Sequence, residues 1–275
     1  MKVDNLSKVS FGEIIDCFLK AFENYYVKMP TDQEYYRQRW KAAKVDFNLS
    51  YGMFDDEKLV GFIIHAVDKR LGLQTAFNTA TGVIPAYRGK RIVQSIYDFA
   101  LRDLRKNGIE KSVLEVITDN ERAVRAYQKV GFKICKDYRC YSGKINSNSD
   151  STIEMQKITM EEYHWDQLPN QQFYSWDFQK ETILEGHYTL YEVIWEGKSE
   201  SYFAIDIKKK YLGQFDVFSQ DQKAWERLFN AIGKVVDEVK IINVDHRLED
   251  KLNYISFLKL NNIVNQFEME LMLID

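Results

Sequence analysis

Short apolar segments alternate with amphipathic helical segments along this chain, and this order constrains its fold more than any other feature. Apolar residues recur at helical spacing over 10–26, and Thr31 with Glu34 forms a capping-box pattern that predicts a second helix to about residue 45. The rest of the first half is expected to run as hairpin, strand, helix, strand, helix and strand, at residues 51–54 with 59–67, 75–84, 88–107, 113–117, 120–130 and 132–142. This alternation predicts an α/β (α+β) fold with a mixed central sheet flanked by helices.

The second half repeats this order. A hairpin, a helix, a strand, a helix and a strand are expected at 190–195 with 202–207, 221–236, 239–244, 248–260 and 263–273. The segment Tyr127-Gln-Lys-Val-Gly-Phe-Lys-Ile aligns with Phe257-Leu-Lys-Leu-Asn-Asn-Ile-Val, which is an offset of 130. Such a repeat predicts two tandem copies of one fold, with two unrelated α/β domains as the alternative. We therefore expect a first domain at 1–143, a polar linker at 144–151 and a second domain at 152–275.

Composition excludes several classes of protein. The 275 residues include 38 Lys and Arg against 41 Asp and Glu, a net charge of -3 that argues against a nucleic-acid partner. No apolar run approaches the roughly 18–20 residues of a membrane span, and Met1–Ser10 lacks the apolar core of a signal peptide. Three cysteines, Cys17, Cys135 and Cys140, are too few for a disulfide scaffold, so a reducing, cytoplasmic setting is expected. The four histidines are scattered, and no metal site is expected.

A basic loop with a single glycine joins an expected strand to an expected helix. It reads Val83-Ile-Pro-Ala-Tyr-Arg-Gly-Lys-Arg-Ile-Val93. The unpaired N–H groups and partial positive charge of a helix N-terminus suit a phosphate, and Arg88, Lys90 and Arg91 add full charges. The loop has neither the P-loop pattern nor the dinucleotide-binding glycine pattern. Taken alone, it is equally typical of a solvated basic helix start.

A second motif follows about 30 residues later, after one strand. It reads Asn120-Glu-Arg-Ala-Val-Arg-Ala-Tyr127-Gln-Lys-Val-Gly131-Phe132, with Asn120 as a helix cap and Gly131 as a helix stop. Together the two stretches resemble the GCN5-related N-acetyltransferase (GNAT) family, whose pattern is V-x-P-x-[YF]-R-[GN]-x-G-x-[GA] and then N-x-x-A-x-x-x-Y-x-x-x-G-F. The resemblance covers 1–143 in element order and 82–132 in its motifs.

This resemblance implies a sheet of GNAT type whose fourth and fifth strands splay apart and hold acyl-CoA between them. The Val83 backbone would pair with the pantetheine arm, Asn120 would contact that arm, and Tyr127 would lie near the CoA sulfur. The pyrophosphate would lie on N–H groups of Arg88, Gly89, Lys90, Arg91, Ile92 and Val93. The chain departs from the pattern at Arg91, where the family has glycine, and at Val93, where it has glycine or alanine. Glycine allows the backbone to approach a ligand closely, so both departures affect how the pyrophosphate would lie against the loop.

The reaction implied by the resemblance moves an acetyl group from acetyl-CoA to a primary amine by direct attack. Tyr127 is the candidate acid, because the reference pKa of a phenol, near 10, lies above that of a thiol, near 8.5. Glu115 is the candidate base, because it interrupts an apolar strand, and its Leu-Glu-Val context resembles family members that acylate protein N-termini. Each has a structural alternative: ring packing for Tyr127, and an exposed or ion-paired position for Glu115. Asn78 and Thr79 are weaker candidates for orienting the amine or a water.

The amine acceptor cannot be identified from the sequence, so small-molecule and peptide amines both stay open. Cys140 is expected to be a core thiol rather than a nucleophile, because no histidine lies near it in the sequence. The side chains expected to line the acceptor pocket are Tyr25, Tyr26, Met29, Tyr35, Tyr36, Tyr138 and Tyr141, with the acids Glu23, Asp32 and Glu34.

In the second half, the stretch at the place of the basic loop reads Asp216-Val-Phe-Ser-Gln-Asp-Gln and carries two acids but no glycine and no basic residue. We therefore expect a degenerate, non-catalytic copy. Three hypotheses stand for the whole chain: an acetyl-CoA-dependent N-acyltransferase, a non-catalytic acyl-CoA-binding regulatory module, and a phosphoanion-binding protein that uses the basic loop alone. The spacing of Asn120, Tyr127 and Gly131 favours the first two. A membrane partner is not expected, and the sequence leaves a homodimer open.

Overall fold

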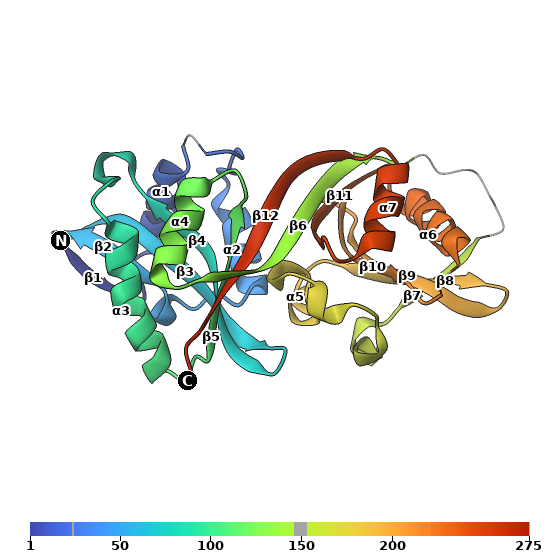
Figure 1. Cartoon of the computed structure of the whole chain (residues 1–275), viewed down its shortest axis with the longest axis horizontal. Coiled ribbons are helices and arrows are strands. Elements are labelled where there is room, and N and C mark those ends of the chain that lie inside the picture. The colour runs from blue at the N-terminus through green and yellow to red at the C-terminus, as the bar shows by residue number, and fades with distance from the viewer. Residues whose placement is uncertain (24, 146–152, 220, 275) are drawn as a thin grey trace. The chain divides into compact units, whose positions relative to one another are not determined.

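The computed structural model describes residues 1–23, 25–145, 153–219 and 221–274. The chain forms two compact units, one of Met1–Cys135 with Glu268–Asp275 and the other of Lys136–Phe267 (Figure 1). No helix in these ranges is long and apolar enough to cross a membrane. Each unit is described by itself below.

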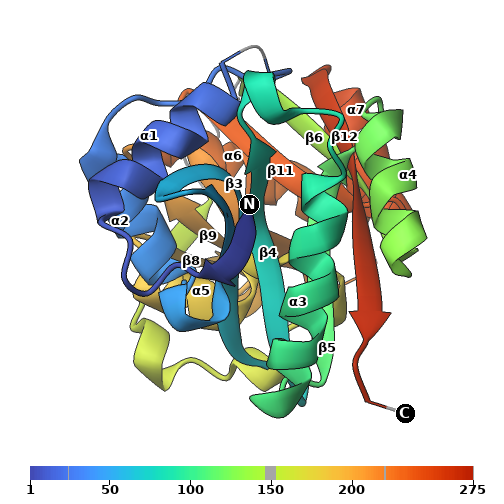
Figure 2. The ribbon, with the colours of Figure 1, turned by 90° about the vertical axis from the view of Figure 1, so that its left-hand side faces the viewer.

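The first unit has a mixed sheet with helices on both faces. Strands β1 to β5 lie in numerical order, with the end of β12 next to β5. Strands β1 to β4 pair antiparallel, whereas β4 and β5 pair parallel. Figure 2 shows α1 and α2 on one side of β3 and β4 and α3 on the other. The elements are β1 (Lys2–Asn5), α1 (Phe11–Ala21), α2 (Gln33–Ala42), β2 (Tyr51–Asp55), β3 (Lys58–Arg70), β4 (Leu73–Val83), α3 (Ile92–Lys106), β5 (Lys111–Ile117), α4 (Glu121–Val130) and the start of β6 (Lys133–Lys144).

The second unit repeats the central part of this arrangement. Strands β8, β9 and β10 pair antiparallel and β10 pairs parallel with β11, as β2, β3, β4 and β5 do in the first unit. The strand order is β12-β6-β11-β10-β9-β8-β7. The elements are β7 (Glu154–Ile158), α5 (Lys180–Glu185), β8 (Thr189–Trp195), β9 (Lys198–Asp206), β10 (Tyr211–Val217), α6 (Gln222–Val235), β11 (Glu238–Asp245), α7 (Glu249–Phe257) and β12 (Asn261–Met272).

Helix capping differs from the sequence prediction in one place. Asp32, not Thr31, caps α2, and its carboxylate accepts from the Glu34 N–H at 2.9 Å. The capping box lies instead at α1, where Ser10 Oγ accepts from the Glu13 N–H at 3.3 Å and Glu13 Oε2 accepts from the Ser10 N–H at 3.1 Å. Aspartate caps a helix as well as serine or threonine does, so the pattern alone does not fix which residue starts it.

Some elements carry no clear sequence signal. Strands β1 and β7 are only four and five residues long. In β10 the register with β9 shifts at Gly213, and such a bulge breaks the alternation by which a strand is recognised. The stretch from 160 to 178 forms short 3₁₀ turns, which have no helical period to detect.

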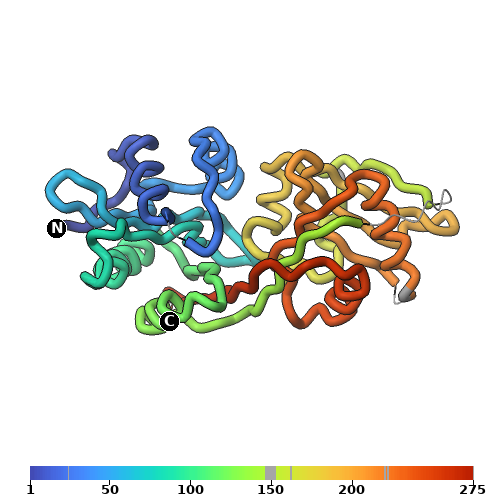
Figure 3. The backbone as a smooth tube through the Cα atoms, turned by 90° about the horizontal axis from the view of Figure 1, so that it is seen from above, coloured from blue at the N-terminus to red at the C-terminus, as the bar shows by residue number. Residues whose placement is uncertain are grey.

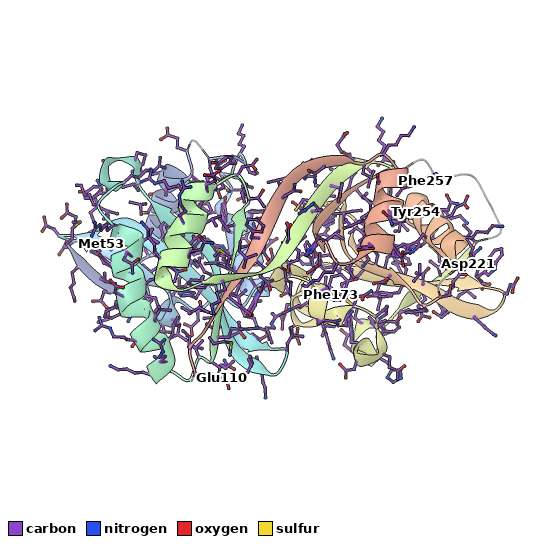
Figure 4. The ribbon with its side chains drawn as sticks, viewed as in Figure 1. Met53, Glu110, Phe173, Asp221, Tyr254 and Phe257 are labelled. Atoms are coloured by element: carbon purple, nitrogen blue, oxygen red, sulfur yellow. The ribbon has the colours of Figure 1, made fainter. Side chains whose placement is uncertain are left out.

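The end of the C-terminal strand, from Glu268 onward, belongs to the first unit. The Leu273 N–H donates to Glu110 O at 2.8 Å, and Arg105 Nε donates to Leu273 O at 3.1 Å. Lys111 Nζ lies 3.7 Å from a Glu270 carboxylate oxygen. Figure 3 shows this red end of the chain beside the green part of the first unit, and Figure 4 labels Glu110 close to the chain end.

The expected domain boundaries at 143 and 152 therefore differ from the division into compact units. Element order along a sequence does not reveal that the end of the last strand lies beside β5 in the first unit. Within the expected linker at 144–151, Lys144 ends β6 and Ile145 is buried in the core of the second unit. The remainder, from 146 to 151, lies outside the described residues.

We expect the last strand to stabilise the fold through its buried side chains. Met269 is fully buried, so Met269→Ala should lower the free energy of unfolding by about 2–5 kcal/mol. Met272 on the same strand is 44% exposed, so Met272→Ala should change it by less than about 0.5 kcal/mol. Urea denaturation of the full chain measures both. Equal effects of the two substitutions would contradict a structural role for this strand.

Candidate functional site

Strands β4 and β5 part halfway along their length. Their pairing ends at Asn78 with Leu114, yet β4 continues to Val83 and β5 to Ile117. The register of β4 with β3 shifts just here and leaves Thr79 as an extra residue. Because a bulge of this kind bends its strand, it accounts for the position at which the sheet opens.

The backbone of β4 faces this opening at alternate residues. The Ile84 N–H donates to Val60 O on β3 at 3.0 Å. Successive residues of a strand direct their N–H and C=O groups to opposite edges, so those of Thr81 and Val83 face the opening. Within the described part of the chain, β5 supplies no partner to them. An extended ligand could therefore pair with this edge as an additional strand would.

The basic loop is turned by two left-handed residues. Gly89 has φ +82° and Arg91 has φ +55°, the region that glycine favours. Helix α3 starts at Ile92, and the Arg91 side chain makes no capping hydrogen bond. The hydrogen bonds of the described residues use none of the N–H groups from Gly89 to Val93. These donors at the positive end of a helix form a site suited to a phosphate.

Arg88 has a different position from the one expected. Its N–H donates to Pro85 O at 3.2 Å within a 3₁₀ turn. Its guanidinium donates to Val83 O at 3.2 Å and to Ala21 O at 2.9 Å. Arg88 thus fastens the loop to the end of β4 and to the end of α1, and its N–H is not open to a phosphate.

Asn120 caps α4, as the sequence predicts. Its side chain accepts from the Ala123 N–H at 3.3 Å and hydrogen-bonds the Tyr25 hydroxyl. Burial raises the pKa of Tyr25, and the hydrogen bond from Asn120 acts in the opposite direction. The Tyr26 hydroxyl lies 3.4 Å from Asp119 O. The segment after α1 therefore reaches the β5–α4 turn at the open end of β5.

Tyr127 projects from α4 into a buried hydroxyl network. Burial raises the pKa of Tyr127 to about 12, while hydrogen bonds from Thr81 and Asn78 act in the opposite direction. Asn78 Nδ2 donates to Thr81 Oγ1 and to the Tyr97 hydroxyl, both at 2.7 Å. Asn78 Oδ1 is buried and has no hydrogen-bond partner among the described atoms. The network lies on β4 at the point where the sheet opens.

Glu115 is the first residue of β5 beyond the last pair with β4. Its side chain is half-buried, whereas Leu114 and Val116 are 1% and 4% exposed. Alternation along a strand places Glu115 on the opposite face from those two residues. Since Asn78 pairs with Leu114 and points toward α3, Glu115 lies on the face opposite α3.

Several other expected site residues have structural roles. The Tyr36 hydroxyl donates to Pro30 O at 2.8 Å, and its ring packs on Phe18 and Trp40. Cys140 is fully buried in the second unit, as expected for a core thiol, and Tyr138 also belongs to that unit. The described residues contain no cluster of three or more His, Cys, Asp or Glu that could hold a metal ion.

Thr81 and Tyr97 were missed by sequence reasoning. Thr81 has a weak signal, since it is a polar residue two positions before Val83 on the same edge of the strand. Tyr97 has none, because its spacing along α3 fits the buried helix face.

The sequence model of the acetyltransferase (GNAT) family matches residues 14–132. Among named relatives, the mycothiol acetyltransferase of Corynebacterium efficiens is 34% identical over 90 residues, which are 32% of this chain and 29% of that protein. The N-alpha-acetyltransferase 30 of Schizosaccharomyces pombe is 26% identical over 98 residues, 35% of this chain and 64% of that protein. The chain thus spans about a third of the length of the mycothiol acetyltransferases that it matches.

The fold of the whole chain has solved counterparts. A tandem GNAT protein from the clavulanic acid biosynthesis pathway superposes with a TM-score of 0.67 over 99% of this chain and 98% of its own, at 13% identity. At that identity the likeness concerns the fold alone. It confirms the predicted fold class, a mixed sheet of GNAT type in two tandem copies.

Arg91→Gly tests the strain in the basic loop. A left-handed non-glycine residue costs about 1–2 kcal/mol, and glycine adds about 0.5–1 kcal/mol of unfolded-chain entropy. We therefore expect the free energy of unfolding to stay level or rise by up to about 1 kcal/mol. Arg102→Gly, inside α3, should lower it by about 1 kcal/mol. Chemical denaturation measures the free energy of unfolding of both variants. A decrease in both of them would show that Arg91 is unstrained.

Proposed function

Residues 14–132 form a domain of the GNAT acetyltransferase family, and from that premise we propose that this chain is an acetyl-CoA-dependent N-acyltransferase. The first unit would carry the reaction, in which the acyl group passes directly from the thioester to a primary amine. The observation that supports this proposal most is the opening between β4 and β5, with Tyr127 buried at its closed end and free backbone donors along its rim.

The residues around the opening suit an acyl-CoA. The edge of β4 offers the N–H and C=O of Thr81 and the N–H of Val83 to the amides of a pantetheine arm, whereas Val83 O already accepts from Arg88. The N–H groups from Gly89 to Val93, with the Lys90 and Arg91 charges, suit its pyrophosphate. The buried, unpartnered Asn78 Oδ1 lacks an N–H donor, and an amide of the arm would supply one.

Glu115 is proposed to accept the proton of the amine. An amine attacks only when its nitrogen lone pair is free, so a base near the thioester speeds the reaction. Glu115 lies at the same level of the sheet as Asn78 but on the other face, so the amine would approach from the face opposite α3. The C–N bond forms as the C–S bond breaks, and the electron pair of the C–S bond leaves with the CoA sulfur.

Tyr127 is proposed to stabilise this sulfur as a hydrogen-bond donor. Its pKa of about 12 lies well above the thiol value, near 8.5. The difference corresponds to about 5 kcal/mol against full proton transfer to the thiolate. The phenol therefore keeps its proton and donates a hydrogen bond as negative charge develops. The thiolate takes its proton after the bond has broken, from the protonated base or from water.

The acceptor is proposed to be a small-molecule or peptide amine. The names of the two relatives, a mycothiol acetyltransferase and an N-alpha-acetyltransferase, cover both classes. A panel of both kinds of amine, with release of CoA thiol as the readout, would identify the acceptor.

Tyr127→Phe separates an acyltransferase from a binding module. Loss of the hydroxyl should lower kcat roughly 100-fold, while the ring and the affinity for acetyl-CoA are retained. Tyr51→Phe removes a buried hydroxyl that bonds Asp103, remote from the opening, and should leave kcat unchanged. Calorimetric titration with acetyl-CoA and a thiol-release assay measure both quantities. Acetyl-CoA binding without turnover by the unmodified chain, over the whole panel, would instead favour the non-catalytic module.

Glu115→Gln tests the proposed base. The variant should have a kcat roughly 100-fold lower. The part of the pH profile that protonation of Glu115 produces at low pH should be absent from it. Rates recover at high pH if the amine itself then loses its proton to water. Glu121→Gln, an exposed carboxylate on α4 that pairs with Arg125, is the matched control and should match the unmodified chain. A purely structural Glu115 would change stability and leave the shape of the pH profile as it was.

A further inference from the structure

The second unit has its own opening, at the position equivalent to that in the first. Strands β10 and β11 pair in parallel only at Tyr211 with Lys240, and then part. Gly213 is the extra residue of β10 and lies four positions before Val217, as Thr79 lies four positions before the end of β4. The same bulge therefore opens the same pair of strands in both units.

The backbone of β10 faces this opening in the same register. The Phe218 N–H donates to Glu200 O at 2.8 Å, as the Ile84 N–H donates to Val60 O in the first unit. Counting back three residues in each strand, Phe215 is the counterpart of Thr81. The N–H and C=O of Phe215 consequently face the opening.

In contrast to Thr81, Phe215 has both backbone groups occupied by side chains of its own unit. Its N–H donates to the Tyr174 hydroxyl at 3.2 Å, and the same hydroxyl donates to Phe215 O at 3.0 Å. Lys251 Nζ donates to Phe215 O at 2.7 Å. Tyr174 directly follows Phe173, which Figure 4 labels in the 3₁₀ segment before α5, and Lys251 comes from α7. Two elements thus close the edge that a pantetheine arm would need.

A buried ion pair holds this closure in place. Lys251 and Asp216 are 2% and 3% exposed, and their charged atoms lie 3.1 Å apart. Lys251 also donates to the Tyr174 hydroxyl at 3.2 Å. Burial lowers the pKa of Lys251, but Asp216 and Tyr174 together outweigh this effect and the pKa is raised, so the ammonium stays charged. Removing either partner would leave an uncompensated buried charge, which makes the pair hard to displace.

The residue equivalent to the proposed acid is also lost. Counted from the residue that precedes each helix, Asn120 before α4 and Leu248 before α7, the position of Tyr127 is taken by Ile255. This corrects by two residues the sequence alignment of Tyr127 with Phe257. Ile255 is fully buried and has no hydroxyl to donate to a sulfur.

We propose that Tyr174 and Lys251 fill the acyl-CoA groove of the second unit, so that the chain binds one acyl-CoA, in the first unit. The inference rests on the proposed function of the first unit. The acidic loop at 216–222 already indicates a degenerate copy, and residue 220 of that loop lies outside the described residues. This inference adds that the strand edge that would bind the pantetheine arm is itself closed. The second unit is then a copy that has replaced its ligand with its own side chains.

The number of binding sites tests this inference. Native mass spectrometry and calorimetric titration of the full chain with acetyl-CoA should give one site per chain. The double variant Lys90→Glu with Arg91→Glu reverses the charge of the basic loop and should lose binding completely. Lys8→Glu with Lys106→Glu makes the same charge change at exposed residues outside the loop and should keep one site. Hydrogen exchange should show acetyl-CoA protecting 79–94 and leaving 212–218 unchanged.

The outcomes separate this inference from the proposed function. Two sites per chain, or one site that survives the loop double variant, would overturn the inference and leave the proposed function standing. Direct protection of 212–218 by acetyl-CoA together with a second site would do the same. No binding by the unmodified chain would overturn the proposed function and, with it, the single site.

Discussion

The early end of pairing between β4 and β5 is the constraint on which the candidate site depends. A bulge at Thr79 turns β4 away from β5 and leaves the backbone groups of Thr81 and Val83 without a neighbouring strand. Backbone polar groups inside a protein require partners, so an opening of this kind is stable only when a ligand, water or side chains fill it. The buried hydroxyl network, the basic loop and the half-buried Glu115 all lie around this opening.

The two units satisfy the same requirement in different ways. In the first, Arg88 donates to Val83 O and Ala21 O, and the backbone groups of Thr81 are the ones that we propose a ligand would bond. In the second, Tyr174 and Lys251 bond the N–H and C=O of Phe215. A buried ammonium is costly unless it is paired, which explains why Asp216 accompanies Lys251. The same backbone geometry thus accompanies the proposed binding site in one copy and an edge bonded by side chains in the other.

Local features of the site could be predicted from the sequence, whereas features made by distant segments could not. Asn120 and Gly131 mark the two ends of α4 as expected, because a cap and a left-handed stop are properties of neighbouring residues. The position of Arg88 depends on the end of α1, 67 residues away, and no pattern near the loop indicates it. Likewise, the return of β12 to the first unit joins residues 110 and 273, so the sequence order suggested a boundary at 143 instead.

The buried network gathers the hydroxyls of Thr81, Tyr97 and Tyr127 around the Asn78 side chain. The Asn78 amide nitrogen has only donors, and it gives them to the Thr81 and Tyr97 hydroxyls. Burial raises the pKa of Tyr127, whereas the hydrogen bonds from Thr81 and Asn78 act in the opposite direction, so the network offsets part of the effect of burial. Helix α4 holds the ring of Tyr127 beside these groups, at the closed end of the opening. In the reaction proposed above, a thioester sulfur at that end would lie beside a hydroxyl already held in place by its surroundings, which is the condition under which such donors contribute most to a rate.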